Sequence, residues 1–345
     1  MRRCSMLVAA AIVAAALVAA PAASAAKVRL AGGATTLKLY DGTARALAGA
    51  GASVVPLTPA KLRSGAVAFP ITGGAIDPAS AAGRIDHSGG LAFRAGGKRV
   101  AIRNFRVHVG SRRAILTAAA GGSRLTVLSL DLSREKVSRP GLGTRVSGVR
   151  AVLAGQAARA LNAAFGVHLF RRGLPIGKVA VNALPAEVAL AGGSTALALD
   201  SGAAAALASL GITAGVVAPG SAESDGLNFP ITGGKVDAES FAGRIRHSGG
   251  LSLTKGSTVV ELTRFTINVD ADPDLTALVG GQRVSILDLD LSALEASVRG
   301  RRITLSGVRA TLTAGAAAAL NQAFGTSVFT AGLAIGTATV KARAL

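Results

Sequence analysis

The sequence predicts a mainly β fold: two tandem antiparallel β-sandwich or flattened-barrel domains, each with two short α-helices. The first reason is a repeat, because residues 69–74 (FPITGG) return letter for letter as residues 229–234. The second is an alternation of polar and apolar residues through most of each repeat, which is typical of half-buried antiparallel strands. The third is that two segments per repeat break this alternation and are rich in helix-forming residues.

The repeat covers almost the whole chain. Residues 83–91 match residues 243–251 at the same shift of 160, whereas residues 130–133 match residues 289–292 at a shift of 159. One residue has therefore been lost or gained between Val107 and Gly121. A repeat of this length is too long for a solenoid unit and fits two sequential globular domains. We expect domain 1 to span residues 27–184 and domain 2 residues 187–345, with the boundary near Pro185.

Period-two alternation marks the strands. It is clear in residues 36–39, 99–103, 105–109, 123–130 and 302–306. Pairs of glycines at 73–74, 96–97 and 121–122 are expected to form hairpin turns, because glycine tolerates the backbone conformations that tight turns need.

Two helices are expected in each repeat. Residues 41–48 begin with Asp41, and their copy at 201–210 begins with Ser201; both are residue types that cap helix N-termini. The second helix is expected at 155–164, with its copy at 315–323. Gly166 and Gly325 follow as helix-stopping residues.

The N-terminus has the three parts of a secretory signal peptide, which we place at residues 1–25: a basic start, an apolar run and a small-residue cleavage site. The apolar run is shorter than the roughly 20 residues that a membrane-spanning helix needs. The only cysteine, Cys4, would be removed with this segment. We therefore expect a secreted or cell-envelope protein with neither disulfides nor a transmembrane anchor after cleavage.

The formal net charge of +20 favours anionic partners, and anionic cell-wall polymers are one such class. A specific nucleic-acid partner is not expected. Proteins that bind single strands stack bases on exposed aromatic side chains, and this chain has ten Phe, one Tyr and no Trp.

No enzyme active site can be assembled from the sequence. The Gly-x-Ser-x-Gly elbow, the phosphate-binding loop and the His-Glu-x-x-His motif are all missing. Of the four histidines only His87 and His247 are repeated, and a structural hydrogen-bonding role is favoured for them over metal ligation. Arg150 and its copy Arg309 are expected to pair with acidic residues of the same domain. We therefore predict a protein that is not an enzyme.

Three elements of the sequence resemble the HtaA domain family, the haem-uptake domains of exported actinobacterial proteins. They are the repeated FPITGG block, the pattern His-x-Gly-x-Leu at His87 and His247, and the ending from Val308 to Gly332. The resemblance implies a mainly β domain with short helices. It also implies a haem-binding site in which a Tyr near the start of the domain is the axial iron ligand and a downstream His supports it.

Tyr40 is the only tyrosine and lies upstream of His87, so the resemblance implies Tyr40 and His87 as cofactor-binding residues, with no metal site other than haem iron at Tyr40. His247 is the weaker candidate, because Asp200 stands in repeat two where Tyr40 stands in repeat one. We predict an exported, non-enzymatic protein that binds haem or porphyrin through domain 1, with hemin or a haem-carrying protein as partner. The alternative is a secreted or cell-envelope structural or interaction protein that has lost haem binding.

Overall fold

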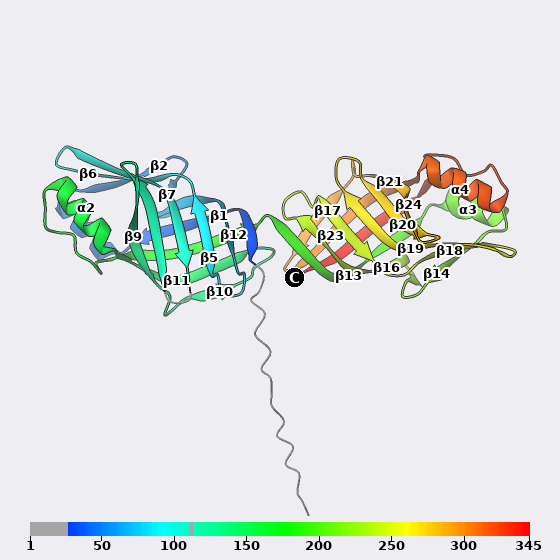
Figure 1. Ribbon diagram of the computed structural model, residues 1–345, viewed down its shortest axis with the longest axis horizontal. Helices are drawn as coiled ribbons and strands as arrows, with labels where there is room; N and C mark the ends of the chain where they lie inside the picture. Colours follow the sequence, from blue (N-terminus) through cyan, green and yellow to red (C-terminus); the bar gives the residue numbers. More distant parts are fainter. Residues whose placement is uncertain (1–26, 111–112) are drawn as a thin grey trace, which may run out of the picture.

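The computed structural model describes residues 27–110 and 113–345, so the predicted signal peptide lies outside the described residues. Figure 1 shows two β domains joined end to end, with the helices at the two outer ends. The last strand of the first sheet ends at Pro185 and the first strand of the second sheet begins at Glu187. Within the described ranges, none of the helices is long and apolar enough to cross a membrane.

Domain 1 is a single antiparallel sheet in which eight strands close into a ring. The order around the ring is β7-β5-β4-β1-β12-β11-β9-β8, and β8 pairs back with β7. Strands β6 and β2 continue outward from β7, while β3 and β10 add short pairings to β4 and β11. The strands are β1 (Val28–Leu39), β2 (Ser53–Leu57), β3 (Lys61–Arg63), β4 (Ala66–Ile76), β5 (Gly83–His87), β6 (Gly90–Ala95), β7 (Lys98–Val109), β8 (Ala114–Ala120), β9 (Ser123–Asp131), β10 (Lys136–Ser138), β11 (Thr144–Leu153) and β12 (Pro175–Pro185).

Domain 2 repeats this topology strand for strand, and the pairing of β19 with β20 closes its ring. The prediction of a mainly β, tandem fold is therefore confirmed. The strands are β13 (Glu187–Leu199), β14 (Thr213–Val217), β15 (Ser221–Glu223), β16 (Gly226–Asp237), β17 (Gly243–His247), β18 (Gly250–Lys255), β19 (Thr258–Val269), β20 (Asp274–Val279), β21 (Gln282–Asp290), β22 (Glu295–Arg299), β23 (Arg302–Leu312) and β24 (Ala334–Ala344).

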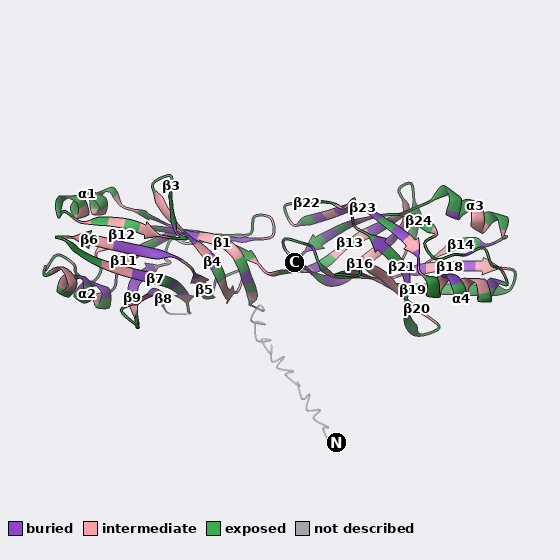
Figure 2. Cartoon of the chain, turned by 90° about the horizontal axis from the view of Figure 1, so that it is seen from above, coloured by how far each residue is buried: buried purple, intermediate pink, exposed green. Residues whose placement is uncertain are grey.

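The alternation of the sequence places each core inside its ring (Figure 2). In β12, for example, Val179, Val181 and Ala183 are buried while Lys178 and Asn182 are exposed. Because successive side chains of a strand point to opposite faces, a run of this kind buries one face against the core and leaves the other in water. Each domain has its own core built in this way.

The same aromatic pair lies in both cores. Phe69 and Phe105 pack edge to face with ring centroids 4.8 Å apart, and so do their copies Phe229 and Phe265, again at 4.8 Å. Edge-to-face packing brings the positive edge of one ring to the negative face of the other, which adds to the free energy gained by burying the rings.

All four predicted helices are present: α1 (Asp41–Gly49), α2 (Gly155–Phe165), α3 (Ser201–Ser209) and α4 (Ala314–Phe324). Gly166 and Gly325 end α2 and α4 in the left-handed conformation, with φ of 70° and 61°. They act as the expected helix stops, since glycine adopts this conformation without the steric cost of a Cβ atom.

The expected capping residues were wrong by one position. Asp41 and Ser201 are the first helical residues, and the caps are Tyr40 and Asp200. The Asp200 carboxylate accepts hydrogen bonds from the backbone N–H groups of Gly202, at 2.8 Å, and Ala203, at 3.4 Å. Tyr40 makes no such bond. At this position a side chain accepts hydrogen bonds from the free backbone N–H groups of the helix in domain 2 but not in domain 1.

The second pair of helices differs in the same way. In α4 the hydroxyl of Thr313 accepts a hydrogen bond from the backbone N–H of Ala316 at 3.2 Å. The matching position before α2 is Ala154, whose side chain cannot accept one. Both helices of domain 1 therefore begin without a side-chain cap, whereas both helices of domain 2 have one.

One glycine pair does not form the expected turn. The pairs at 96–97 and 121–122 lie in hairpin turns with positive φ, as predicted. Gly73 and Gly74 instead lie inside β4, next to a bulge in its pairing with β5. A Cβ atom at Gly74, where φ is 105°, would collide with the backbone carbonyl of Arg84. The pair allows the strand to change register there and does not reverse the chain.

The caps give a stability prediction. Asp200→Ala and Thr313→Ala should each lower the free energy of unfolding by about 1 kcal/mol, because each leaves backbone N–H groups of a helix terminus without a partner. Tyr40→Ala is the control, since Tyr40 makes no cap bond. Urea unfolding of the full chain measures these changes. An unchanged midpoint for both Asp200→Ala and Thr313→Ala would contradict the assignment.

The bulge gives a second prediction. Gly74→Ala and Gly234→Ala should each cost about 1–3 kcal/mol of stability, because both glycines have positive φ and both Cβ atoms would meet a backbone carbonyl. Gly73→Ala should be nearly neutral, since nothing lies within 4 Å of its Cβ position. Thermal unfolding compares the three variants, and equal losses at Gly73 and Gly74 would disprove the bulge.

Candidate functional site

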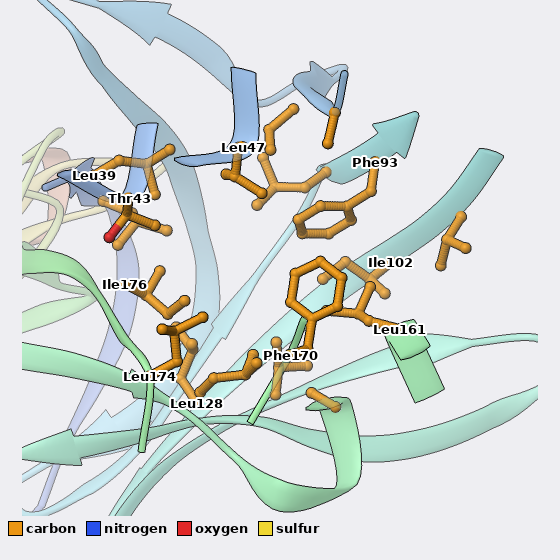
Figure 3. A pocket seen from close by; sticks show the side chains of 18 of the residues that line it. Leu39, Thr43, Leu47, Phe93, Ile102, Leu128, Leu161, Phe170, Leu174 and Ile176 are labelled. Carbon is orange, nitrogen blue, oxygen red and sulfur yellow. The ribbon is translucent and has the colours of Figure 1, made fainter. Parts of the chain in front are cut away.

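A cavity of about 630 Å³ opens at the helix end of domain 1. Its walls come from strands of the ring and from β6, while α1, α2 and the segment that follows α2 surround its entrance (Figure 3). The lining is almost entirely apolar. Among the side chains that point into it are Leu39, Leu47, Phe93, Ile102, Leu161 and Phe170.

Tyr40 is the one polar aromatic residue of the lining. It follows the last residue of β1 and precedes α1, and its backbone N–H donates to the carbonyl of Ile176 at 3.1 Å. This bond fixes the backbone of Tyr40 against the start of β12. The side chain is half-buried and borders the cavity. The sequence-predicted ligand therefore lies in the wall of a large apolar cavity.

A positive charge lies within electrostatic reach of Tyr40. Arg150 pairs with Asp131, as expected, and its Nε donates to Asp131 Oδ2 at 3.0 Å. The pKa of Arg150 is raised above its ordinary value, mainly by this hydrogen bond and also by the charge that Tyr40 carries when ionised.

His87 lies beneath the cavity and is fully engaged in hydrogen bonds. Its Nδ1 is 3.2 Å from the carbonyl of Phe105 and its Nε2 is 2.6 Å from the hydroxyl of Thr35. A carbonyl can only accept, so Nδ1 carries the proton and Nε2 accepts from Thr35. Thr35 and Phe105 both line the cavity, so His87 positions two wall residues while neither of its nitrogens is free for Tyr40.

Domain 2 repeats this network. His247 Nδ1 is 3.2 Å from the carbonyl of Phe265 and Nε2 is 2.7 Å from the hydroxyl of Thr195. Burial lowers the pKa of both imidazoles from 6.5 to about 4, because a charged ring would lose its hydration. The two histidines thus share one structural role, which is the hydrogen-bonding role that the sequence favours.

The positions that line this cavity carry larger residues in domain 2 at some places and smaller ones at others, such as Ala214 for Val54 and Leu253 for Phe93. At three positions an alanine of domain 1 is replaced by a larger aliphatic residue in domain 2: Ala50 and Leu210, Ala52 and Ile212, Ala120 and Val279. All three alanines line the cavity of domain 1. A comparison of the two repeats position by position could have found them, whereas analysis of motifs could not.

Several of the matching side chains are more deeply buried in domain 2 than in domain 1. Ile212 is 4% exposed, and Leu210 packs against the core. Phe324 and Phe329 are buried there, whereas their copies Phe165 and Phe170 are half-buried and line the cavity of domain 1. Another cavity, of about 480 Å³, lies in domain 2 beside Pro219, His247 and Ser248.

Neither domain contains a group of three or more His, Cys, Asp or Glu that could hold a metal ion, as far as the described residues go. The remaining chemistry of the site is therefore that of a single phenol in an apolar cavity, with an arginine nearby.

A scan against protein-family models finds no match to the chain, and a search of curated proteins finds none either. Among solved structures, the chain is similar to the C-terminal domain of HtaA from Corynebacterium glutamicum: 18% identity, 45% of this chain and 98% of that one, TM-score 0.37. A domain-swapped dimer variant of that domain is also similar, with 18% identity, 41% and 89% coverage and a TM-score of 0.32. The haem-binding protein HtaB from the same organism has 12% identity, 46% and 96% coverage and a TM-score of 0.31.

The buried histidines predict a loss of stability in acid. Because the folded pKa of about 4 lies below the unfolded value of 6.5, the unfolded chain binds the proton first, so stability is full above pH 6.5 and falls progressively toward about pH 4. Each domain should lose about 1 kcal/mol between pH 7 and about pH 5.5. His87→Gln and His247→Gln should flatten this slope in urea unfolding. A slope equal to that of the wild type would contradict the assignment.

Proposed function

We propose that domain 1 binds haem in its apolar cavity, with the Tyr40 phenolate as the iron ligand, and that domain 2 supports the fold without binding a ligand. One observation carries the proposal. In domain 1 the tyrosine lies in the wall of an open apolar cavity, whereas at the matching end of domain 2 Asp200 takes its place and Phe324 and Phe329 are buried. A drift of unrelated surface residues would not change the two features together.

The residues present fit such a group. A volume of about 630 Å³ lies within the range of ligand cavities, roughly 300–1,000 Å³. Phenolate oxygen is an established ligand of haem iron. Apolar side chains such as Phe93 and Phe170 offer surface for a macrocycle, while Arg150 lies near enough to interact electrostatically with Tyr40. When bound, haem would supply the iron chemistry; the protein would bind it and shield it from water.

The absent cap supports a ligand role for Tyr40. An Asp at this position hydrogen-bonds two N–H groups of the following helix in domain 2, and domain 1 forgoes these bonds. Tyr40 is therefore less favourable for helix stability than an Asp would be. Such a residue in a cavity wall is expected where ligand binding, and not folding, determines which amino acid is present.

His87 enters the proposal as a positioning residue. It holds Thr35 and the backbone of Phe105, and these in turn form part of the cavity wall. His247 does the same in domain 2, so we propose no ligand contact for it. The protein would act outside the cytoplasm as an exported carrier that is not an enzyme, in keeping with the predicted signal peptide.

The alternative, a structural or interaction protein without haem, has one observation in its favour. Domain 2 shows that this fold is complete with its interior filled and its histidine network intact. If domain 1 did not bind haem, both domains would serve only as a scaffold.

Titration of the full chain with hemin, followed by visible absorption, tests the proposal. We expect one hemin per chain and the charge-transfer band of a ferric phenolate. Tyr40→Phe should abolish the band and weaken binding at least about tenfold. It should leave the melting temperature unchanged. A wild-type chain that binds two hemins, or a Tyr40→Phe variant with the wild-type spectrum, would contradict the assignment.

A second variant tests the contribution of the cavity independently of the proposed iron ligand, Tyr40. Replacing the three alanines with their domain 2 counterparts, Ala50→Leu, Ala52→Ile and Ala120→Val, should abolish hemin binding although Tyr40 is kept. The reverse control is Asp200→Tyr, which should not create a second site because the space beside it is filled. Hemin binding that survives the triple substitution would place the site outside the cavity.

A further inference from the structure

The two domains carry very different charge. Residues 27–184 contain 24 Lys and Arg against 5 Asp and Glu, whereas residues 187–345 contain 12 against 13. The positive charge of the whole chain therefore belongs to domain 1, although both domains have the same fold. Fold stability does not require this charge, because domain 2 is built without it.

Part of this charge surrounds the mouth of the cavity. Six exposed cations form what we call the basic rim, and they lie on α1, at the start of β7, on α2 and on the segment that follows α2: Arg45, Lys98, Arg99, Arg159, Arg171 and Arg172. Figure 2 shows α1, α2 and β6 at the same end of domain 1. All six positions are neutral in domain 2, where they are Ala205, Thr258, Val259, Ala318, Thr330 and Ala331.

The basic rim is free to attract an anionic partner. None of the six takes part in an ion pair within the described part of the chain, in contrast to Arg84, Arg106 and Arg150 on the flank of the domain. Asp41 is the one acid on the two helices of this end. Free cations that lie close together raise the local potential and draw anions toward the cavity.

An apolar contact surface lies within the basic rim. Leu169, in the segment after α2, is 62% exposed and lies two residues before Arg171. Ala160 of α2 is exposed as well, and both residues line the cavity mouth. Cationic side chains around exposed aliphatic ones are the combination by which proteins attach to the surface of anionic lipid bilayers.

We infer that the helix end of domain 1 docks on an anionic lipid surface, with the basic rim on the head groups, Leu169 in the interface and the cavity mouth facing the bilayer. The six cations of the basic rim are more than a single bound ligand needs, because a ligand with two carboxylates would pair with only two of them. Protein interfaces are enriched in exposed aromatic side chains, whereas Phe93 and Phe170 here point into the cavity. This inference does not rest on haem binding.

Co-sedimentation of the full chain, without hemin, with vesicles of phosphatidylglycerol and phosphatidylcholine tests the charge. We expect binding to weaken as the share of phosphatidylglycerol in the vesicles is reduced. Binding should also be lost near 1 M salt, where the screening length is about 3 Å. Neutralising four rim residues should weaken binding at least about tenfold: Arg45→Gln, Arg159→Gln, Arg171→Gln and Arg172→Gln.

A control with the same loss of charge distinguishes docking at this end from general attraction. It changes four exposed cations on β3 and near β10, and it should weaken binding far less: Lys61→Gln, Arg63→Gln, Arg134→Gln and Lys136→Gln. Equal losses in the two variants would overturn the proposed orientation.

The chain contains no tryptophan, so a single one can report the depth of a chosen site. Leu169→Trp should shift its fluorescence to shorter wavelength when anionic vesicles are added. Leu62→Trp, at a residue 64% exposed on β3, should not change. A fluorescence shift in the Leu62→Trp variant alone would overturn the inference. Binding to polyglutamate but not to vesicles would also overturn it and would point to an acidic macromolecule as the partner. Hemin titration of the same variants shows separately whether the haem proposal holds.

Discussion

The pairing of β8 with β7 determines the rest of each domain, because it turns an open sheet into a closed ring with an interior. A closed ring has no free edge between its eight strands, so the whole hydrophobic face must be covered from inside. Side chains of the strands fill most of that interior. The helix end is the part that strands alone do not fill, and the two domains complete it differently. In domain 2 Ile212, Phe324 and Phe329 are buried there, while domain 1 has an open cavity.

Beneath this end, a buried histidine joins strands that are not neighbours in the ring. His87 of β5 bonds the side chain of Thr35 on β1, although β4 lies between the two strands, and it also bonds the backbone of β7. A neutral, fully bonded imidazole can be buried at modest cost, whereas one with an unmet nitrogen could not. His247 makes the same hydrogen bonds in domain 2. The two domains therefore share this histidine network and differ at the helix end.

The sequence predicts the strands and helix ends that occur in both repeats. Period-two alternation located strands such as β9 and β23, and glycines such as Gly166 marked helix ends, because both signals are local. The bulge at Gly74 was misjudged, since a glycine pair in a turn and one at a bulge look alike until the partner strand is known. The cap at Asp200 was missed by one residue, which is within the usual uncertainty of helix ends.

The site itself was accessible only in part. Tyr40 stood out as the single tyrosine, yet nothing local to it indicates a cavity. The alanines at 50 and 52 follow α1 and Ala120 ends β8, and only the fold brings these two distant segments to one cavity. His87 likewise has its partners 52 and 18 residues away along the chain. Contacts of such separation depend on topology, which a pattern of residues does not contain.

The lack of a cap on α1 also bears on the rate at which an occupant could be exchanged. This helix has nine residues, no buried side chain and no side-chain cap, and it forms part of the cavity entrance. A helix of this length contributes little stability of its own, and local opening takes place first where few buried contacts must be broken. The entrance is therefore formed partly by a short helix that can unfold at low cost. Exchange through it can proceed while the strand ring stays intact, on a timescale set by fraying of one short helix and not by unfolding of the domain.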